Sequence, residues 1–145
     1  MLFRSFSRRG ILDQRLAAEH CSRLVADYDI RADSLAVLAG QLSGGNQQKA
    51  VLARELHGEP RLLLAAQPTR GLDVGAIEFV HRRLVEDRDK GRAILLISLE
   101  LEDIRSLSDR ALVICEGQIV AELPPNSSEE EFGVVMTGGG RREAA

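Results

Sequence analysis

Residues 42–49 have the sequence Leu-Ser-Gly-Gly-Asn-Gln-Gln-Lys, which places a hydroxyl and two glycines where a helix is about to begin. A helix N-terminus has unsatisfied N–H groups and about half a positive charge, so it can bind an anion. Gly44 and Gly45 would let a phosphate approach the backbone, and Ser43 supplies a hydroxyl and a helix cap. Apolar residues at helical spacing follow over 47–57. The stretch alone also fits an ordinary capped helix after a Gly-Gly turn, and the residues that follow decide between the two.

The composition is that of one soluble globular domain or of a piece of a larger one. The chain has 145 residues, 44% of them hydrophobic and 28% charged. A net charge of −3 provides no electrostatic footprint for nucleic acid, so no nucleic-acid partner is expected. Cys21 and Cys115 have no metal or redox spacing, so we expect reduced thiols. No apolar run approaches the ~20 residues that span a bilayer, and residues 1–10 lack the apolar region of a signal peptide.

The first 58 residues predict a helical subdomain. Apolar residues recur at three- and four-residue steps over 12–28, which indicates an amphipathic helix. Gly58 and Pro60 end the second predicted helix. No strand is evident in residues 1–58, so we interpret them as the remnant of a helical subdomain that carries the Ser-Gly-Gly stretch.

Residues 59–137 predict part of an α/β domain. Continuous apolar runs at 62–66 and 93–98 are typical of strands buried on both faces. Asp73 should cap a helix that reaches about Lys90. The remaining predicted elements are a helix at 101–107, strands at 111–115 and 118–123 around the turn Glu116-Gly117, and a helix from Ser128 to Met136. Alternating strands and helices indicate a parallel sheet flanked by helices, followed by a flexible tail at 138–145.

Taken together, these segments resemble the ATP-binding cassette (ABC) ATPases. In that family a Leu-Ser-Gly-Gly signature loop precedes the Walker B strand, which here ends in Gln67-Pro68-Thr69, and a D-loop that carries an aspartate, here Asp73. The Asn-Gln-Gln-Lys continuation and residues 68–76 are similar to the subgroup that powers bacterial import of simple sugars and nucleosides. The resemblance covers about residues 8 to 138 and implies part of a P-loop NTPase (RecA-like) fold, from the second cassette of a tandem pair.

The chain departs from this family at three catalytic positions. A competent Walker B strand ends Asp-Glu-Pro-Thr, where this chain has Ala66 and Gln67, and the switch histidine is replaced by Leu99. Alanine has no oxygen for Mg²⁺, and glutamine can orient a water but cannot accept its proton. We therefore expect a degenerate half-site with no metal ligands of its own. A shifted base at Glu100 is the alternative, which the strand register disfavours.

The phosphate-binding sequence Gly-x-x-x-x-Gly-Lys-Ser/Thr is absent from these 145 residues. That loop cradles the β- and γ-phosphates, so we expect that the chain does not hold a nucleotide alone. The sequence resembles a cassette from beyond this loop onward, which makes Met1 an internal start or the chain a truncated reading. A cassette without this strand should also expose a sheet edge that favours aggregation.

The resemblance implies a role shared with a second nucleotide-binding cassette. Ser43, Gly44 and Gly45 would contact the γ-phosphate of ATP held by that cassette, with Mg²⁺ in the same shared site. Asn46 and Gln47 would shape the helix start, and Asp73 would communicate between the two sites.

The resemblance also implies partners and a location. Transmembrane permease subunits would bind the cassettes, a substrate-binding protein would act indirectly, and the protein would be cytoplasmic, peripheral on the inner face of the cell membrane. The substituted catalytic positions favour a nucleoside substrate over ribose or galactose. A non-transport cassette ATPase, in DNA repair or translation for example, and a non-functional truncated cassette are the alternatives.

The remaining polar residues predict no further site. The three histidines lack ligand spacing, so surface or helix-end positions are expected for His20, His57 and His81. The charged residues between 82 and 90 are expected to form a solvated helix face with local ion pairs.

Overall fold

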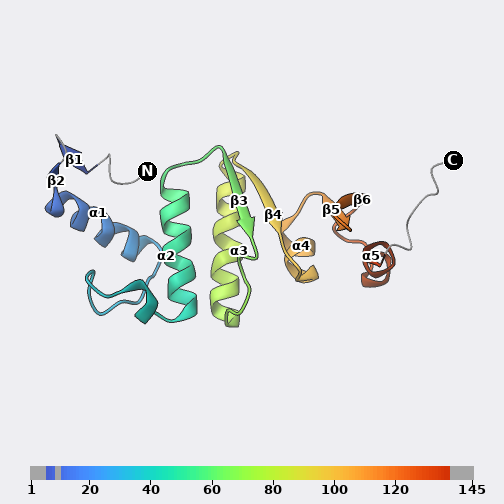
Figure 1. Cartoon of the computed structure of the whole chain (residues 1–145), viewed down its shortest axis with the longest axis horizontal. Helices are drawn as coiled ribbons and strands as arrows, with labels where there is room; N and C mark the ends of the chain where they lie inside the picture. The colour runs from blue at the N-terminus through green and yellow to red at the C-terminus, as the bar shows by residue number, and fades with distance from the viewer. Residues whose placement is uncertain (1–5, 9–10, 138–145) are drawn as a thin grey trace. The chain divides into compact units, whose positions relative to one another are not determined.

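The computed structural model describes residues 6–8 and 11–137, so the predicted tail at 138–145 lies outside the described residues. Two compact units make up the chain. The first comprises residues up to 63 together with 69–80, and the second comprises 64–68 together with the residues from 81 onward. The α-helices and β-strands of both units are labelled in Figure 1.

The first unit contains two very short strands and two long helices. β1 (Ser7–Arg8) pairs antiparallel with β2 (Ile11–Leu12), so the prediction that residues 1–58 contain no strand is wrong. Two-residue strands are too short to show the period of two that identifies a strand in sequence. α1 (Gln14–Asp27) begins two residues later than predicted because Leu12 belongs to β2 and Asp13 caps the helix, accepting from the Leu16 N–H at 3.0 Å.

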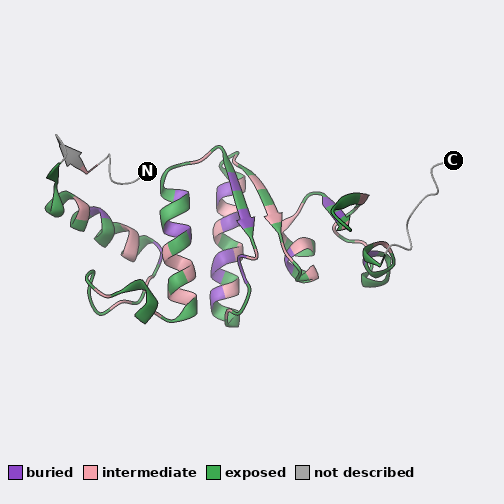
Figure 2. Ribbon diagram, in the orientation of Figure 1, coloured by how far each residue is buried: buried purple, intermediate pink, exposed green. Residues whose placement is uncertain are grey.

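A short 3₁₀ helix, η2 (Ala39–Gln41), precedes α2 (Gly44–His57), and α3 (Val74–Asp89) begins in this unit. The core of the unit forms around α2 and the first half of α3, and its buried residues appear purple in Figure 2. Tyr28, at the end of α1, packs its ring 6.3 Å from the ring of Phe79 on α3. The apolar residues buried in this unit are Tyr28, Leu52, Ala53, Leu56, Leu63, Ala76, Phe79 and Val80.

His20 is buried on α1, so its predicted surface or helix-end position is wrong. Its ring lies 4.9 Å from the ring of Phe6 and 4.2 Å from that of His57. Among the described residues, its Nε2 atom has no hydrogen-bond partner. His57 is exposed at the last residue of α2, as predicted. An amphipathic pattern does not distinguish a polar residue on the buried face from one at its margin, because that depends on what packs there.

We expect His20 to make the folded chain less stable in mild acid. Burial, the charge of His57 and the charge of Arg23 lower the pKa of His20 below its usual 6.5. The unfolded chain therefore binds this proton first, and the free energy of unfolding falls as the pH drops through about 6.5. Urea unfolding at pH 7.5 and 5.5 should show this loss in the wild type, and His20→Phe should reduce it. An equal loss in both proteins would contradict the assignment.

The second unit contains most of β3, all of β4 and a C-terminal hairpin. β3 (Leu62–Ala66), whose first two residues belong to the first unit, neighbours β4 (Ala93–Ile97), and their arrows run in the same direction in Figure 1. α3 connects them, as in a parallel β-α-β unit. After α4 (Leu101–Leu107), β5 (Ala111–Cys115) and β6 (Gln118–Leu123) form the predicted antiparallel hairpin.

The hairpin and the last helix have their own small core. α5 (Glu129–Met136) begins with the predicted cap, since the Ser128 Oγ accepts from the Glu131 N–H at 3.1 Å. Phe132 of α5 is buried with Ala111 and Val113 of β5. The hydrogen bonds of Glu131 to Ser128 lower the pKa of that carboxyl group, which is consistent with acids favoured in the first turn of a helix.

The prediction that the two core strands are buried on both faces is wrong for the described structure. Burial alternates along β3, where Leu62 and Leu64 are each 62% exposed while Leu63 and Ala65 are buried. No residue of β4 is fully buried. A continuous apolar run shows that a strand suits burial on both faces, but the covering elements must come from elsewhere.

The charged face of α3 contains the predicted local ion pairs. One of its charged residues, Asp87, is buried, although the whole face was predicted to be solvated. Arg83 pairs with Glu86 at 2.8 Å and Arg88 with Asp89 at 2.9 Å. Asp87 is buried and pairs with Arg92 and Lys90. Cys21 and Cys115 are free thiols, as predicted. Within 6–8 and 11–137, the helices are all too short or too polar to cross a membrane.

Candidate functional site

The predicted phosphate-binding stretch lies at the start of α2, and Ser43 is its cap. The Ser43 Oγ accepts from the Asn46 N–H at 3.4 Å, which confirms the predicted cap. The helix begins at Gly44, three residues before the start that apolar spacing indicated, because the cap rather than the first apolar residue ends the preceding loop. Ser43 and Gly44 are both exposed, so the first N–H groups of α2 are open to a ligand.

The two amide side chains of this stretch hold the loop in place. The Asn46 Oδ1 accepts from the backbone N–H of Arg31 at 2.9 Å, and its Nδ2 donates to the Ser43 Oγ at 3.0 Å. The Gln47 Nε2 donates to the backbone carbonyl of Leu42 at 2.8 Å. Both side chains therefore bind the loop itself, so a ligand would meet Ser43 and the backbone first.

The two glycines have different surroundings. A Cβ atom on Gly44 would meet nothing within 4 Å, whereas one on Gly45 would lie 3.1 Å from the Cβ of Ala76 and 3.7 Å from Asp73 Oδ2. Contacts at 3.1 Å are closer than ordinary carbon–carbon packing of about 3.5–4.0 Å. Gly45 therefore permits close packing of α2 against the start of α3, while Gly44 leaves space beside the backbone.

Asp73 lies next to the Ser-Gly-Gly stretch. Its Oδ1 accepts from the Ala76 N–H at 2.9 Å, which confirms that it caps α3. Its other carboxylate oxygen, Oδ2, faces Gly45 and lies 3.7 Å from the position that a Cβ atom on Gly45 would occupy. The structure thus brings Asp73 and Gly45, which the resemblance assigns to the D-loop and the signature loop, close together although 28 positions separate them in the sequence.

Lys49 and Asp29 form a contact that sequence reasoning missed. The Lys49 Nζ donates to the backbone carbonyl and to the Oδ2 of Asp29, both at 2.8 Å, and lies 4.7 Å from the centre of the Phe79 ring. The hydrogen bond and charge of Lys49 lower the pKa of Asp29. Asp29 has φ +47, the left-handed region in which aspartate is tolerated. The only sequence signal was an aspartate at a helix end, 20 residues from its partner.

The three residues predicted to stand at catalytic positions, Ala66, Gln67 and Leu99, lie in the second unit, at the carboxyl ends of β3 and β4. Ala66 is the last residue of β3, and the N–H of Gln67 donates to the carbonyl of Ile97, the last residue of β4, at 2.7 Å. Gln67 has φ +51, a conformation often found at functional sites. Leu99 is 74% exposed two residues beyond β4. None of the three side chains can act as a base or provide a carboxylate to a metal.

A polar network around the buried Asp103 holds the segment that contains Leu99. The Ser98 Oγ donates to Asp103 Oδ2 at 2.8 Å, and His81 Nε2 lies 2.7 Å from Asp103 Oδ1. The N–H of Glu100 in turn donates to the Ser98 Oγ at 3.0 Å. A nucleophilic triad needs the histidine between the serine and the acid, whereas here the acid is in the middle. The network therefore positions the segment and does not activate Ser98.

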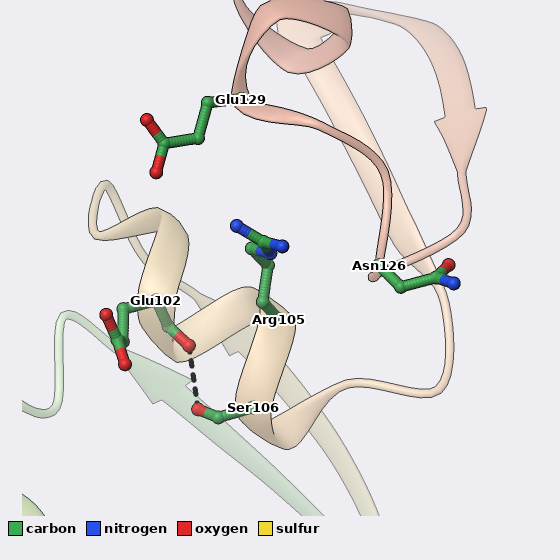
Figure 3. A pocket seen from close by; sticks show the side chains of 5 residues that line it. All are labelled: Glu102, Arg105, Ser106, Asn126 and Glu129. Atoms are coloured by element: carbon green, nitrogen blue, oxygen red, sulfur yellow. Dashed lines mark hydrogen bonds between the residues drawn. The ribbon is translucent and has the colours of Figure 1, made fainter.

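A separate hollow of about 360 Å³ contains none of the predicted site residues. Glu102, Arg105 and Ser106 of α4 line it together with Asn126 and Glu129 (Figure 3). All five residues are exposed, and two acids accompany the single arginine. Ligand sites are usually apolar and enclosed with a few directed polar groups, so this hollow does not fit one.

Comparison with known proteins identifies relatives among import ATPases. No protein-family model matches the chain. The guanosine import ATP-binding protein NupO of Bacillus subtilis is 50% identical over 140 residues, which are 96% of this chain and 28% of that protein. The nucleoside import ATP-binding protein NupA of Lactococcus lactis is 47% identical over 138 residues, 94% of this chain and 27% of NupA. The chain thus spans just over a quarter of the length of these curated relatives.

Solved cassettes share the fold. The dimeric cassette MJ0796, in a post-hydrolysis state bound to ADP and Pi, has a TM-score of 0.68 and 22% identity over 86% of this chain and 53% of its own. An ATP-binding subunit of an ABC transporter has a TM-score of 0.69 and 22% identity, covering 93% of this chain and 60% of its own. Both likenesses confirm the predicted α/β P-loop NTPase fold. The chain is thus homologous, over nearly all of its length, to part of nucleoside and sugar import ATP-binding proteins, and it shares the fold of ATP-binding cassettes.

Proposed function

We propose that this chain is part of an importer's ATP-binding subunit and supplies Ser43, Gly44 and Gly45 to ATP bound on a second cassette. The observation that carries the proposal is the exposed and firmly held start of α2. Ser43 and Gly44 face solvent, while Asn46 and Gln47 hold the loop by hydrogen bonds of 2.8–3.0 Å. Such a helix start presents N–H groups and a hydroxyl to an anion without rearranging.

In this proposal each residue of the stretch has a distinct task. The Ser43 hydroxyl and the first N–H groups of α2 would donate to oxygens of the γ-phosphate. Gly44 leaves room for the phosphate because nothing lies within 4 Å of the position that a Cβ atom would occupy there. Asp73, whose carboxylate lies beside Gly45, would link this loop to the neighbouring site through the start of α3.

The chain's own catalytic positions do not fit Mg²⁺. Ala66, Gln67 and Leu99 offer no carboxylate or imidazole, and no three His, Cys, Asp or Glu side chains within 6–8 and 11–137 are grouped to hold a metal ion. The ATP and Mg²⁺ of the proposal belong to the site that this chain shares with the partner cassette, and its own half-site is degenerate.

The partners of the proposal are a second cassette and permease subunits, with a substrate-binding protein acting indirectly. The protein would be cytoplasmic, on the inner face of the membrane. A nucleoside substrate is favoured over a sugar because the two relatives described above are named for guanosine and nucleoside import. A non-transport cassette ATPase is disfavoured by those names and by the net charge of −3, which suits no nucleic-acid partner.

The isolated chain should release no phosphate from Mg²⁺-ATP above the buffer rate, because the catalytic carboxylates are absent. Adding it to a cassette of the same importer with an intact phosphate-binding loop should raise that cassette's hydrolysis. A colorimetric phosphate assay measures both. Robust turnover by the chain alone, abolished by Gln67→Ala, would contradict the degenerate site. No stimulation of the intact cassette would instead indicate a non-functional truncated cassette.

A further inference from the structure

The hydrogen-bonding direction of Asn46 follows from its contact with the main chain. Amide oxygen and nitrogen are hard to tell apart by position alone, so their assignment depends on the partners. The Arg31 N–H can only donate, and the Asn46 atom that lies 2.9 Å from it must therefore be the oxygen Oδ1. The amide nitrogen Nδ2 then faces Ser43, as the structure has it.

This orientation determines the direction of the Ser43 hydroxyl. An amide nitrogen can only donate, so the Ser43 Oγ accepts from Asn46 Nδ2 at 3.0 Å. The same oxygen also accepts from the Asn46 backbone N–H at 3.4 Å. A hydroxyl has two lone pairs and one proton, and Asn46 uses both lone pairs. The proton therefore points away from Asn46, and Ser43 itself is exposed.

The Arg31 N–H determines how the Asn46 side chain is oriented. The turn that carries this N–H is itself bonded to α2. Arg31 lies two residues after Asp29, whose φ of +47 turns the chain after α1. Lys49 of α2 donates to both the carbonyl and the carboxylate of Asp29 at 2.8 Å, and its side chain is only 13% exposed. One connected set of bonds therefore runs from Lys49 through the turn at 29–31 to Asn46 and Ser43.

We propose that Asn46 is a positioning residue that keeps the Ser43 hydroxyl turned outward as a donor to a phosphate oxygen. This inference rests on the proposed function, in which Ser43 meets the γ-phosphate of ATP on the partner cassette. Phosphate oxygens only accept hydrogen bonds, so a hydroxyl whose lone pairs are already occupied is matched to them. A donor that is oriented in advance needs no reorganisation when the phosphate arrives.

The substitution Asn46→Asp tests this inference because it keeps the shape of the side chain and reverses one bond. One carboxylate oxygen still accepts from the Arg31 N–H, but the other can only accept from Ser43, so the hydroxyl proton turns inward. A negative charge in the first turn of a helix favours folding, so the thermal midpoint of the chain should stay equal or rise. A loss of activity by Asn46→Asp could then not be explained by a loss of folding stability.

The experiment is a double-mutant cycle on Mg²⁺-ATP hydrolysis by the complex of this chain with its partner cassette. Ser43→Ala should lower kcat about 100-fold, the effect of removing one donor to a developing charge. Asn46→Asp should lower it by a similar factor, and the double variant should be within about 2-fold of Ser43→Ala alone. The effect of Asn46→Asp in the Ser43→Ala background measures the added charge by itself.

The outcomes separate the inference from the function on which it rests. Losses in kcat that multiply in the double variant would overturn the positioning role. It would also be overturned if Asn46→Asp left kcat unchanged while Ser43→Ala lowered it. In both cases the function proposed for Ser43 stands. Unchanged hydrolysis by Ser43→Ala would overturn the function itself. Asn46→Ala, which frees the hydroxyl to rotate without adding charge, should lose less activity than Asn46→Asp.

Discussion

Ser43→Arg should lower ATP hydrolysis by the assembled importer by at least about 100-fold, because it removes a phosphate donor and fills the space in which the phosphate would lie. Gln67→Ala should leave hydrolysis within about 2-fold, since in the proposed function its own half-site has no catalytic carboxylate. Ser43→Arg tests whether this chain contributes to the site on the partner cassette, and Gln67→Ala tests whether its own half-site is inactive. Steady-state phosphate release by the purified complex measures both.

A matched control for Ser43→Arg is Ser34→Arg. Ser34 is also an exposed serine of the first unit whose Oγ accepts one backbone N–H, that of Ala36, at 3.0 Å. It lies outside the proposed site, so the arginine there should leave hydrolysis within about 2-fold of the wild type. If Gln67→Ala were the damaging substitution and Ser43→Arg the silent one, the roles of the two half-sites would be reversed.

Phe79→Ala should cost about 3–5 kcal/mol of folding free energy, the usual effect of truncating a buried phenylalanine. Phe79 is buried on α3, packs against Tyr28 and lies beneath the ammonium group of Lys49. A small domain has about 5–15 kcal/mol of net stability, so this loss would remove a large share of it. Urea unfolding followed by far-UV circular dichroism measures it.

Val74→Ala provides the control on the same helix. Val74 is 72% exposed at the first turn of α3, so its truncation removes little buried area, and alanine is the better helix former. Its unfolding midpoint should match or slightly exceed that of the wild type. Equal losses for Val74→Ala and Phe79→Ala would show that the Tyr28–Phe79–Lys49 contact does not hold the unit together.

Elements and caps were predictable from the sequence because they depend on neighbours a few positions away. Ser43, Asp73 and Ser128 each accept from an N–H three residues later, as the cap pattern predicts. The two-residue strands β1 and β2 and the three-residue 3₁₀ helix η2 were missed, since such short elements show no period. The assignments of Ala66, Gln67 and Leu99 as degenerate positions stay predictions that rest on the family resemblance.

Contacts between distant residues were not predictable in the same way. The burial of His20 depends on Phe6 and His57, and the exposure of Leu62 and Leu64 depends on what covers β3. Apolar patterning shows which residues suit burial, but the solvent exposure of each depends on the elements that pack around it.

The stretch at 42–49 shows both contributions most clearly. By itself the sequence determined that a capped helix start with two glycines lies there, in a chain that resembles a cassette without catalytic carboxylates. Only the tertiary structure decided that Gly45 is needed for packing against Ala76, that Gly44 is open, and that Arg31 orients Asn46 toward Ser43. Caps form within one helical turn, whereas close approaches and the direction of a hydroxyl proton depend on partners brought near by folding.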